Sequence, residues 1–193
     1  MRDASQWADE VSAKRPWRPA FFEAIARELQ ELSTPDASVL ELGSGPGFLA
    51  QYLLDPVRLR SYTALDFSDA MHTLAKHRLG SKAEVVAFLT RDFLDPTWDE
   101  GLLQYSSVVT LQAVHELRHK RKAPALYSRV LPHVHPDGVF LMCDHYYGVS
   151  GMTNSALFMS ELEHVEALTR GGFVEVTCIH KEGGMVLYRA KSA

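Results

Sequence analysis

Residues 39–50 read Val-Leu-Glu-Leu-Gly-Ser-Gly-Pro-Gly-Phe-Leu-Ala, and this stretch decides the fold. It begins with a short, mostly apolar run of the kind found in buried parallel strands. The alternate glycines Gly43, Gly45 and Gly47 then predict a turn in which no Cβ keeps the backbone away from a ligand. Apolar residues from Phe48 onward begin a helical pattern. The stretch therefore predicts a strand, a tight turn and a helix whose N–H groups and dipole face a ligand.

The spacing of these glycines restricts the kind of ligand. Dinucleotide-binding turns read G-x-G-x-x-G, and phosphate-binding loops end in Gly-Lys-Ser/Thr. This turn reads G-x-G-x-G and contains no lysine. Glu41, on the strand just before the turn, would be unfavourable beside a pyrophosphate but is compatible with an ammonium group. A glycine-rich turn without a ligand is the alternative interpretation.

The stretch resembles the first motif of the class I S-adenosylmethionine-dependent methyltransferases, which reads hydrophobic-Asp/Glu-hydrophobic-Gly-x-Gly-x-Gly. The resemblance implies that the methionine half of S-adenosyl-L-methionine lies against the turn. The residues that it assigns to this half are Glu41, Gly43, Ser44, Gly45, Gly47 and Phe48.

A second acidic residue, Asp66, ends a strand predicted over residues 61–65. In a βαβ unit this position lies at the carboxyl edge of the sheet, where a carboxylate can accept hydrogen bonds from both ribose hydroxyls. Phe67 and Ser68 follow, and Ser68 is expected to cap the next helix. The pattern resembles the second motif of the family, which implies that Asp66 binds the ribose and that Met71 lies near the adenine. A plain turn or capping role for Asp66 is the alternative.

Two later strand ends complete the expected cofactor site. Asp92 and Phe93 follow the predicted third strand. In the family an Asp at this point bonds the adenine amino group, and the next residue meets the ring. Gln112 and Ala113 follow the predicted fourth strand, where the family has a polar residue and small-molecule enzymes then have a hydrophobic-His pair. The resemblance implies that these two residues lie under the methyl group.

His115 is the candidate general base. It follows the fourth strand, at the edge where the methyl group must point, and the ordinary histidine pKa near 6.5 suits a base at neutral pH. Glu116 could orient it, but adjacent residues on a helix diverge. We therefore expect His145 or Tyr146, which follow the fifth strand, as its partner across the cleft. A role in lining the pocket or capping a helix is the alternative for His115.

The acceptor of the methyl group is expected to be a small, largely apolar or aromatic molecule, methylated at oxygen or nitrogen. The chain lacks Asn/Asp-Pro-Pro-Tyr/Phe, the signature of amino methylation on nucleobases and glutamine, and it lacks the Pro-Cys pair used on pyrimidine C5. Five side chains are expected at the edge of the acceptor pocket or, alternatively, in the core: Trp17, Tyr146, Tyr147, Met152 and Phe158.

The order of the predicted elements indicates an α/β fold. We expect one doubly wound, Rossmann-like domain over residues 36–193, with a mostly parallel seven-stranded sheet and a C-terminal antiparallel hairpin. Residues 1–35 are expected to form an N-terminal arm and an amphipathic helix over 19–32. The arm either packs onto the domain or forms part of a lid.

The composition restricts location and partners. The chain has 193 residues, 46% hydrophobic and 23% charged, as in ordinary globular proteins. A net charge of −4 without a long basic run disfavours nucleic acid as a partner. Residues 1–10 show no apolar signal region, so we expect a cytoplasmic monomer or homodimer without a membrane partner.

Cys143 and Cys178 are expected as buried thiols. His133 and His135 have no evident third ligand, so no metal site is predicted.

Three other functions stay open on the sequence alone. One is an NAD(P)-binding oxidoreductase, against which the glycine spacing argues. The second is a methyltransferase acting on RNA or protein. The third is a cofactor-binding protein of the same fold without catalysis, since a fold does not determine its function.

Overall fold

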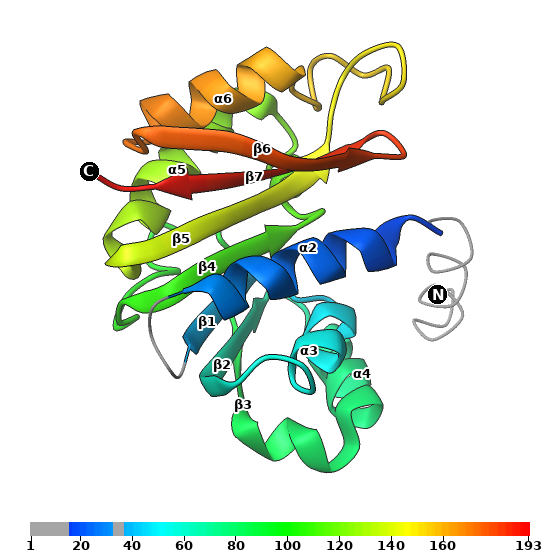
Figure 1. Cartoon of the computed structure of the whole chain (residues 1–193), viewed down its shortest axis with the longest axis vertical. Coiled ribbons are helices and arrows are strands. Elements are labelled where there is room, and N and C mark those ends of the chain that lie inside the picture. The colour runs from blue at the N-terminus through cyan, green and yellow to red at the C-terminus, as the bar shows by residue number, and fades with distance from the viewer. Residues whose placement is uncertain (1–15, 33–36) are drawn as a thin grey trace.

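Seven strands form one sheet in the computed structural model, which describes residues 16–32 and 37–193 (Figure 1). The strand order is β3-β2-β1-β4-β5-β7-β6, and all strands are parallel except β7. The bounds are β1 Ala37–Leu42, β2 Leu59–Asp66, β3 Val86–Thr90, β4 Tyr105–Leu111, β5 Val134–His145, β6 Glu175–Glu182 and β7 Met185–Lys191. The predicted α/β class, seven-stranded sheet and C-terminal antiparallel hairpin are confirmed.

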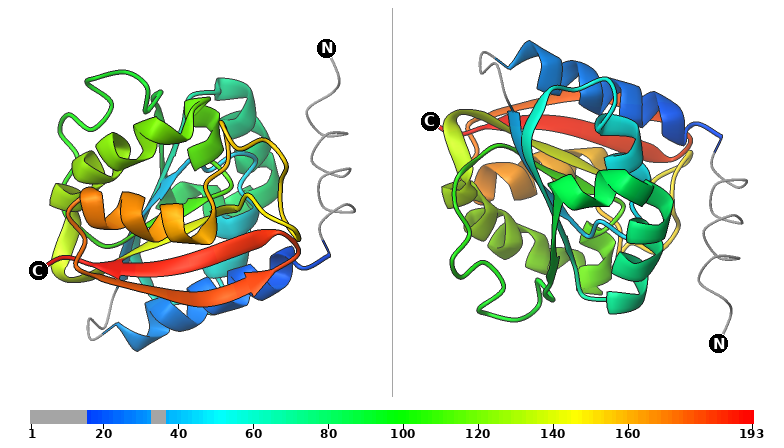
Figure 2. Two further views of the ribbon diagram at one scale, coloured as in Figure 1. Left: turned by 90° about the horizontal axis from the view of Figure 1, so that it is seen from above. Right: turned by 90° about the horizontal axis from the view of Figure 1, so that it is seen from below.

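Helices cover both faces of the sheet. One face carries α2 (Arg18–Glu31), α3 (Phe48–Leu53) and α4 (Asp69–Leu79), and the other carries α5 (Ala123–Val130) and α6 (Glu161–Arg170). The two turned views show the same three layers, with α2 and α6 on opposite sides of β6 and β7 (Figure 2). This is the doubly wound arrangement expected when parallel strands alternate with helices.

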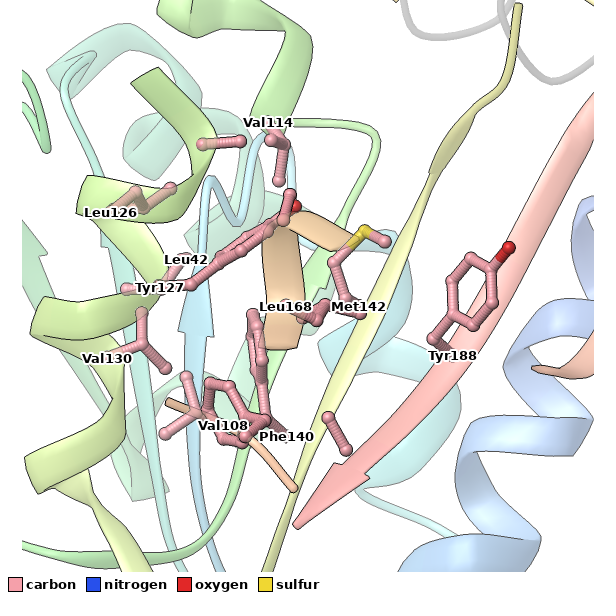
Figure 3. Close-up of a cluster of buried hydrophobic side chains, with 14 of the residues drawn as sticks. Leu42, Val108, Val114, Leu126, Tyr127, Val130, Phe140, Met142, Leu168 and Tyr188 are labelled. Atoms are coloured by element: carbon pink, nitrogen blue, oxygen red, sulfur yellow. The ribbon is translucent and has the colours of Figure 1, made fainter. Parts of the chain in front are cut away.

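Strand β5 shows how the sequence builds a core on both faces. Phe140 and Met142 belong to the cluster under α5 and α6, whereas Leu141 and Cys143 belong to the cluster under α2, α3 and α4. All four side chains are fully buried. Figure 3 shows the first cluster, in which Phe140 lies below Tyr127 of α5. Because each such burial contributes roughly 1.5–3 kcal/mol, the alternation fixes the register of the strand.

Local capping signals set several helix boundaries. Ser68 Oγ accepts a hydrogen bond from Met71 N and begins α4, as predicted. Ser160 begins α6 through a capping box with Glu163. The apolar pattern over 156–170 predicts a longer helix, but the chain before the cap forms a turn and α6 covers only Glu161–Arg170. The cap satisfies backbone N–H groups that an extended helix would satisfy otherwise, so it stops the helix there.

The segment after β4 also differs from its prediction. The apolar positions Ala125, Leu126, Val130 and Leu131 predict a single helix over 119–131. In the structure, short 3-10 turns at Val114–Leu117 and Lys120–Lys122 come before α5, which covers only Ala123–Val130. His119 is extended, and its ring accepts a hydrogen bond from Arg121 N. This local side-chain bond competes with helix formation and delays the start of α5.

The chain order reverses between β1 and β4, which lie side by side at the centre of the sheet. The segments leaving these two strands diverge to opposite faces, to α3 and to α5. In open α/β sheets the crevice at such a reversal, outside the carboxyl ends of the strands, is where ligands bind. A ligand site is therefore expected at the loops after β1 and β4.

Two further findings concern the surface. Cys143 is buried, as predicted, but Cys178 on the edge strand β6 is exposed, so the prediction of two buried thiols is wrong for Cys178. β6 is paired with another strand on one side only and contains no fully buried residue, which fits the exposure of Cys178. Within the described ranges, no helix has the length and apolar character needed to span a bilayer.

Candidate functional site

A cavity of about 340 Å³ lies at the predicted place, between the loops after β1, β2 and β4. It brings together most of the side chains and turn residues that the sequence assigned to a cofactor. Those that line it are Glu41, Gly43, Ser44, Gly45, Phe48, Asp66, Phe67, Ser68, Met71, Phe93, Gln112 and Ala113. Gly47 and Asp92 do not line it.

The three glycines of the turn have positive φ angles of 72°, 53° and 78°, but they serve different purposes. A Cβ on Gly43 would lie 2.3 Å from Ala113 Cβ, and one on Gly47 would lie 2.9 Å from Ala75 Cβ. A Cβ on Gly45 would meet no atom within 4 Å. Gly45 therefore faces the open cavity. Gly47 instead allows α4 to pack closely against the turn, so Gly47 is not among the residues that line the cavity.

Asp66 connects the turn to the end of β2. Its Oδ2 accepts a hydrogen bond from Gly45 N at 2.8 Å, and its Oδ1 accepts one from Ser68 N at 3.0 Å. The side chain is buried and lines the cavity. A carboxylate has about four lone-pair positions, so each oxygen retains capacity for a further donor. Asp66 can thus position the glycine turn and still accept hydrogen bonds from a ligand.

Glu41 also lines the cavity. Its Oε2 accepts a hydrogen bond from Tyr62 OH at 2.6 Å. Burial raises the pKa of Glu41 to about 8; the Tyr62 hydrogen bond and Arg18 oppose this rise, and Asp66 adds to it. Glu41 is therefore mostly protonated at neutral pH, and a ligand cation beside it would favour the ionised form.

Arg18, which the sequence interpretation missed, lines the cavity beside Glu41. It comes from the first turn of α2, and its guanidinium lies 5.0 Å from the centre of the Phe48 ring. The run Pro16-Trp17-Arg18-Pro19 indicates a helix start, since proline favours the first turn of a helix, but it does not point to a cavity. Glu41 and Arg18 thus bring a carboxyl group and a guanidinium group to the same cavity.

Gln112 lines the cavity from the loop after β4. Its φ is positive, at 58°, which is uncommon for a residue with a Cβ. Its backbone N donates to Cys143 O at 2.8 Å, and its Nε2 lies 2.9 Å from His145 Nε2. Such strain persists only where the surroundings hold it, and it concentrates at functional sites.

Asp92 does not reach the cavity. Its Oδ1 accepts a hydrogen bond from Leu94 N at 2.8 Å, so the carboxylate caps the turn that follows β3. Phe93, the next residue, does line the cavity. Asp in a loop often bonds its own backbone two residues on, and that local bond takes Asp92 away from the site.

His115 lines the cavity close to Gln112 and is held by Asp144. The ring Nδ1 lies 2.7 Å from Asp144 Oδ1, and the backbone N of His115 donates to Asp144 Oδ2 at 2.9 Å. Burial raises the pKa of Asp144, but the hydrogen bond and charge of His115 outweigh it, so the net pKa lies below the usual value. Asp144 is therefore an ionised carboxylate at neutral pH.

The ring nitrogen Nδ1 of His115 bonds Asp144, a residue that the sequence interpretation did not name as its partner, and His145 packs edge-on against the same ring. The His145 ring is 5.8 Å from the His115 ring, centre to centre, and its Nε2 faces Gln112. Tyr146 is buried away from the cavity, under the Lys181 ammonium. Asp144 and His145 both border the small hollow beside His115, but it is the carboxylate of Asp144 that reaches the ring nitrogen Nδ1. The acidic residue at the end of β5 was visible in the sequence, in the same position that Asp66 has at the end of β2.

The side chains expected at an acceptor pocket also lie outside this cavity. Trp17 packs against Gly183 in the turn between β6 and β7. Phe158 is buried against the rings of His115 and His145. Tyr147 and Met152 are partly exposed in the loop after β5 and are joined by a bridge.

Comparisons with known proteins agree with this geometry. A family model described as a methyltransferase domain matches residues 40–140. No curated protein matches the chain. Among solved structures, Streptomyces venezuelae DesVI has a TM-score of 0.76 at 16% identity, with 100% of both chains covered. An S-adenosylmethionine-dependent methyltransferase from Clostridium acetobutylicum has a TM-score of 0.74 at 12% identity, covering 97% of this chain and 99% of its own.

A third solved structure carries a cofactor. Human N-acetylserotonin methyltransferase in complex with SAM has a TM-score of 0.71 at 15% identity, covering 94% of this chain and 54% of its own. At such identities these structures show a shared fold, and the residues of the cavity must be interpreted from this chain itself.

Proposed function

Because the chain belongs to the class I S-adenosylmethionine-dependent methyltransferases, we propose that it methylates a small-molecule acceptor at oxygen or nitrogen. When bound, S-adenosyl-L-methionine supplies a methyl group made electrophilic by a sulfonium. The chain's own residues must hold this cofactor, align the acceptor and keep water out. The observation that carries the proposal is the open space at Gly45, beside a carboxylate that already binds the glycine turn.

The residues of the cavity fit the cofactor group by group. Glu41, with Gly43, Ser44, Gly45 and Phe48, would hold the methionine half, where an ammonium favours the ionised form of Glu41. Asp66, followed by Phe67 and Ser68, would hold the ribose, and Met71 and Phe93 would lie against the adenine. Gln112 and Ala113 would lie under the methyl group. Arg18, which lines the same cavity, would pair with the carboxylate of the cofactor.

The other residues that the sequence assigned to the site differ in how closely they approach the cavity. His115 lies at the cavity and is suited to contact an acceptor. His145 would act through Gln112, whose amide it faces, and Tyr146 has no direct part in this arrangement. Asp92 and Gly47 would support the cofactor loops without touching the ligand.

We also propose that residues 36–193 form the catalytic domain and that the N-terminal arm completes it. α2 contributes Arg18 to the cavity, which supports a role for this part of the chain. Residues 1–15, which include the rest of the predicted lid, lie outside the described residues.

A cofactor titration followed by an acceptor screen tests the proposal. Calorimetry should show binding of S-adenosylmethionine and S-adenosylhomocysteine and none of NADH. Isotope from a labelled methyl group should then appear in small hydroxylated or amino compounds. Transfer to bulk RNA or protein, with none to small acceptors, would contradict the proposed acceptor class. Absence of any cofactor binding would contradict the proposed function itself.

A further inference from the structure

The turn between β6 and β7 carries the indole ring of Trp17. This turn consists of Gly183 and Gly184, whose φ angles are positive, 55° and 77°. A Cβ on Gly183 would lie 2.3 Å from Trp17 Cδ2, so the indole rests directly on the backbone of the turn. Figure 2 shows the N-terminal end of α2 beside this turn. The turn is itself fixed to the end of β5, because Gly184 O accepts a hydrogen bond from Tyr146 N at 3.2 Å.

The shape of the turn does not by itself require glycine at position 183. Positive φ at both positions of a two-residue hairpin turn matches type I′, in which Asn or Asp is common at the first position and Gly at the second. Asn in place of Gly183 is therefore compatible with the turn, but its Cβ would collide with the indole of Trp17. The close contact with Trp17 is the feature that requires a glycine here.

Trp17 also begins α2, and the next residue, Arg18, lines the cavity. Trp17 is the N-cap residue, but its side chain caps no backbone N–H of the helix. Helix ends fray where nothing holds them. Among the described residues the indole N–H has no hydrogen-bond partner, so packing on the turn is what holds Trp17. The contact with Gly183 therefore fixes the start of α2 and, with it, the backbone of Arg18.

Arg18 reaches the cavity from this fixed start of the helix. Its Cζ lies 5.0 Å from the centre of the Phe48 ring, and Arg18, Phe48 and Glu41 line the same cavity. A guanidinium has five N–H donors in a planar fork, so it can bind a carboxylate together with other partners. A long side chain that is already held in place loses less conformational freedom when a ligand binds. Support of the backbone at Arg18 should therefore strengthen binding of an anionic group.

We propose that Trp17 and Gly183 are positioning residues, whose contact holds Arg18 at the cavity for the carboxylate of the cofactor. The inference rests on the proposed function and specifies how the amino-acid end of the cofactor is recognised. It makes the C-terminal hairpin part of cofactor binding, although Gly183 does not line the cavity. Release of the indole should weaken binding of a ligand that carries the carboxylate and spare a ligand that lacks it.

Two ligands that differ only in this carboxylate test the recognition in the native chain. S-adenosylhomocysteine has the group, and its decarboxylated analogue, S-adenosyl-3-thiopropylamine, lacks it. In calorimetry the native chain should bind S-adenosylhomocysteine about tenfold more tightly than the analogue, and Arg18→Gln should bind the two about equally. Equal affinities in the native chain would overturn the proposal, and this comparison needs no variant to fold. Failure of the proposed function is distinct, because neither ligand would then bind.

Substitutions at the contact distinguish positioning from a merely structural role. Trp17→Ala and Gly183→Asn should each weaken S-adenosylhomocysteine binding by about fivefold and leave affinity for the analogue within about twofold. Trp17→Phe should keep most of the native affinity, since packing and not the indole N–H holds the side chain. Gly101→Asn is the matched control, because Gly101 has a φ of 73° and no atom near its Cβ position, and both affinities should stay unchanged.

The double variant completes the test. Once Trp17→Ala has removed the indole, Gly183→Asn should weaken S-adenosylhomocysteine binding no further, because the two substitutions break one contact. Full additivity of the two losses would overturn the proposal. An equal loss for both ligands in Trp17→Ala would also overturn it, since a structural role alone would affect the two ligands alike.

Discussion

Asp66 and Asp144 occupy equivalent places on the two sides of the central strands. Asp66 ends β2 and binds the turn after its neighbour β1, whereas Asp144 lies near the end of β5 and binds the loop after its neighbour β4. Each buried carboxylate accepts backbone N–H bonds from the neighbouring loop and from its own strand end. The same structural device thus builds two different halves of one cavity.

The difference lies in what each carboxylate holds. Asp66 holds a glycine whose backbone faces open space, which suits a ligand that is bound. Asp144 holds an imidazole ring, which suits a group that exchanges a proton. A chemically similar residue therefore positions the glycine turn on one side and the predicted general base, His115, on the other. Changes at the two sides should separate cofactor affinity from turnover.

The largest expected effect is on turnover at the Asp144 side. His115→Gln should lower kcat by roughly 10²–10⁴-fold, because the base is lost, and should leave S-adenosylhomocysteine affinity nearly intact. Steady-state rates with a phenol acceptor and calorimetry check the two parts. A variant that loses affinity and turnover together would break the separation.

A large effect on affinity is expected at the Asp66 side. Gly45→Val should weaken S-adenosylhomocysteine binding by about 100-fold or more, which corresponds to about 2.7 kcal/mol, because the added side chain fills the space of the ligand. Gly80→Val is the matched control, since Gly80 has a similar φ of 57° and equally open surroundings at the end of α4. Both glycines have a positive φ, so both substitutions strain the backbone, and equal affinities in the two variants would show that the glycine turn is not the site.

A moderate effect is expected for Asp66 itself. Asp66→Ala should weaken S-adenosylhomocysteine binding by roughly 1–3 kcal/mol, because charge-assisted bonds to the ribose are lost and the turn is released. Asp92→Ala should change affinity little, since that carboxylate caps its own turn outside the cavity. Calorimetry on both variants measures which of the two carboxylates contributes to S-adenosylhomocysteine binding. A larger loss for Asp92→Ala would restore the adenine contact predicted from the sequence.

The effect that is smallest over a single pH unit concerns Glu41. The folded-state pKa of about 8 lies above the ordinary value of 4.5, so the folded chain binds the extra proton between these values. The free energy of unfolding should therefore fall as pH rises from about 5 to 8, with a contribution of about 1 kcal/mol per pH unit. Glu41→Gln keeps an acceptor for Tyr62 and should flatten this slope in denaturant titrations. An unchanged slope would show that Glu41 is ionised in the free protein.

The sequence predicts the two halves of the site unequally, for a physical reason. The glycine turn, Asp66 and Ser68 follow from local patterns, because turn and cap chemistry depends on neighbouring residues. The pairing of His115 with Asp144 joins residues from two strand ends, and only the register of β4 on β5 brings them together. His145 was expected in its place because the face of a residue near a strand end depends on where the pairing begins.

The same limit explains the other differences. Phe158 and Trp17 are apolar residues whose burial follows from tertiary packing, so the sequence did not distinguish a pocket edge from a core. Arg18 belongs to a helix that packs onto the sheet from outside the motif region, and no local pattern links it to Glu41. The fold was predictable because alternation and glycine spacing act locally, whereas contacts between separate elements were not.

Calorimetric titration of S-adenosylhomocysteine into the native chain, Asp66→Ala and Asp144→Asn tests the central claim most directly. The native chain should bind, Asp66→Ala should bind more weakly by roughly 1–3 kcal/mol, and Asp144→Asn should bind within about twofold of the native chain. Equal weakening in both variants, or none in either, would contradict the assignment of cofactor binding to one carboxylate and proton transfer to the other.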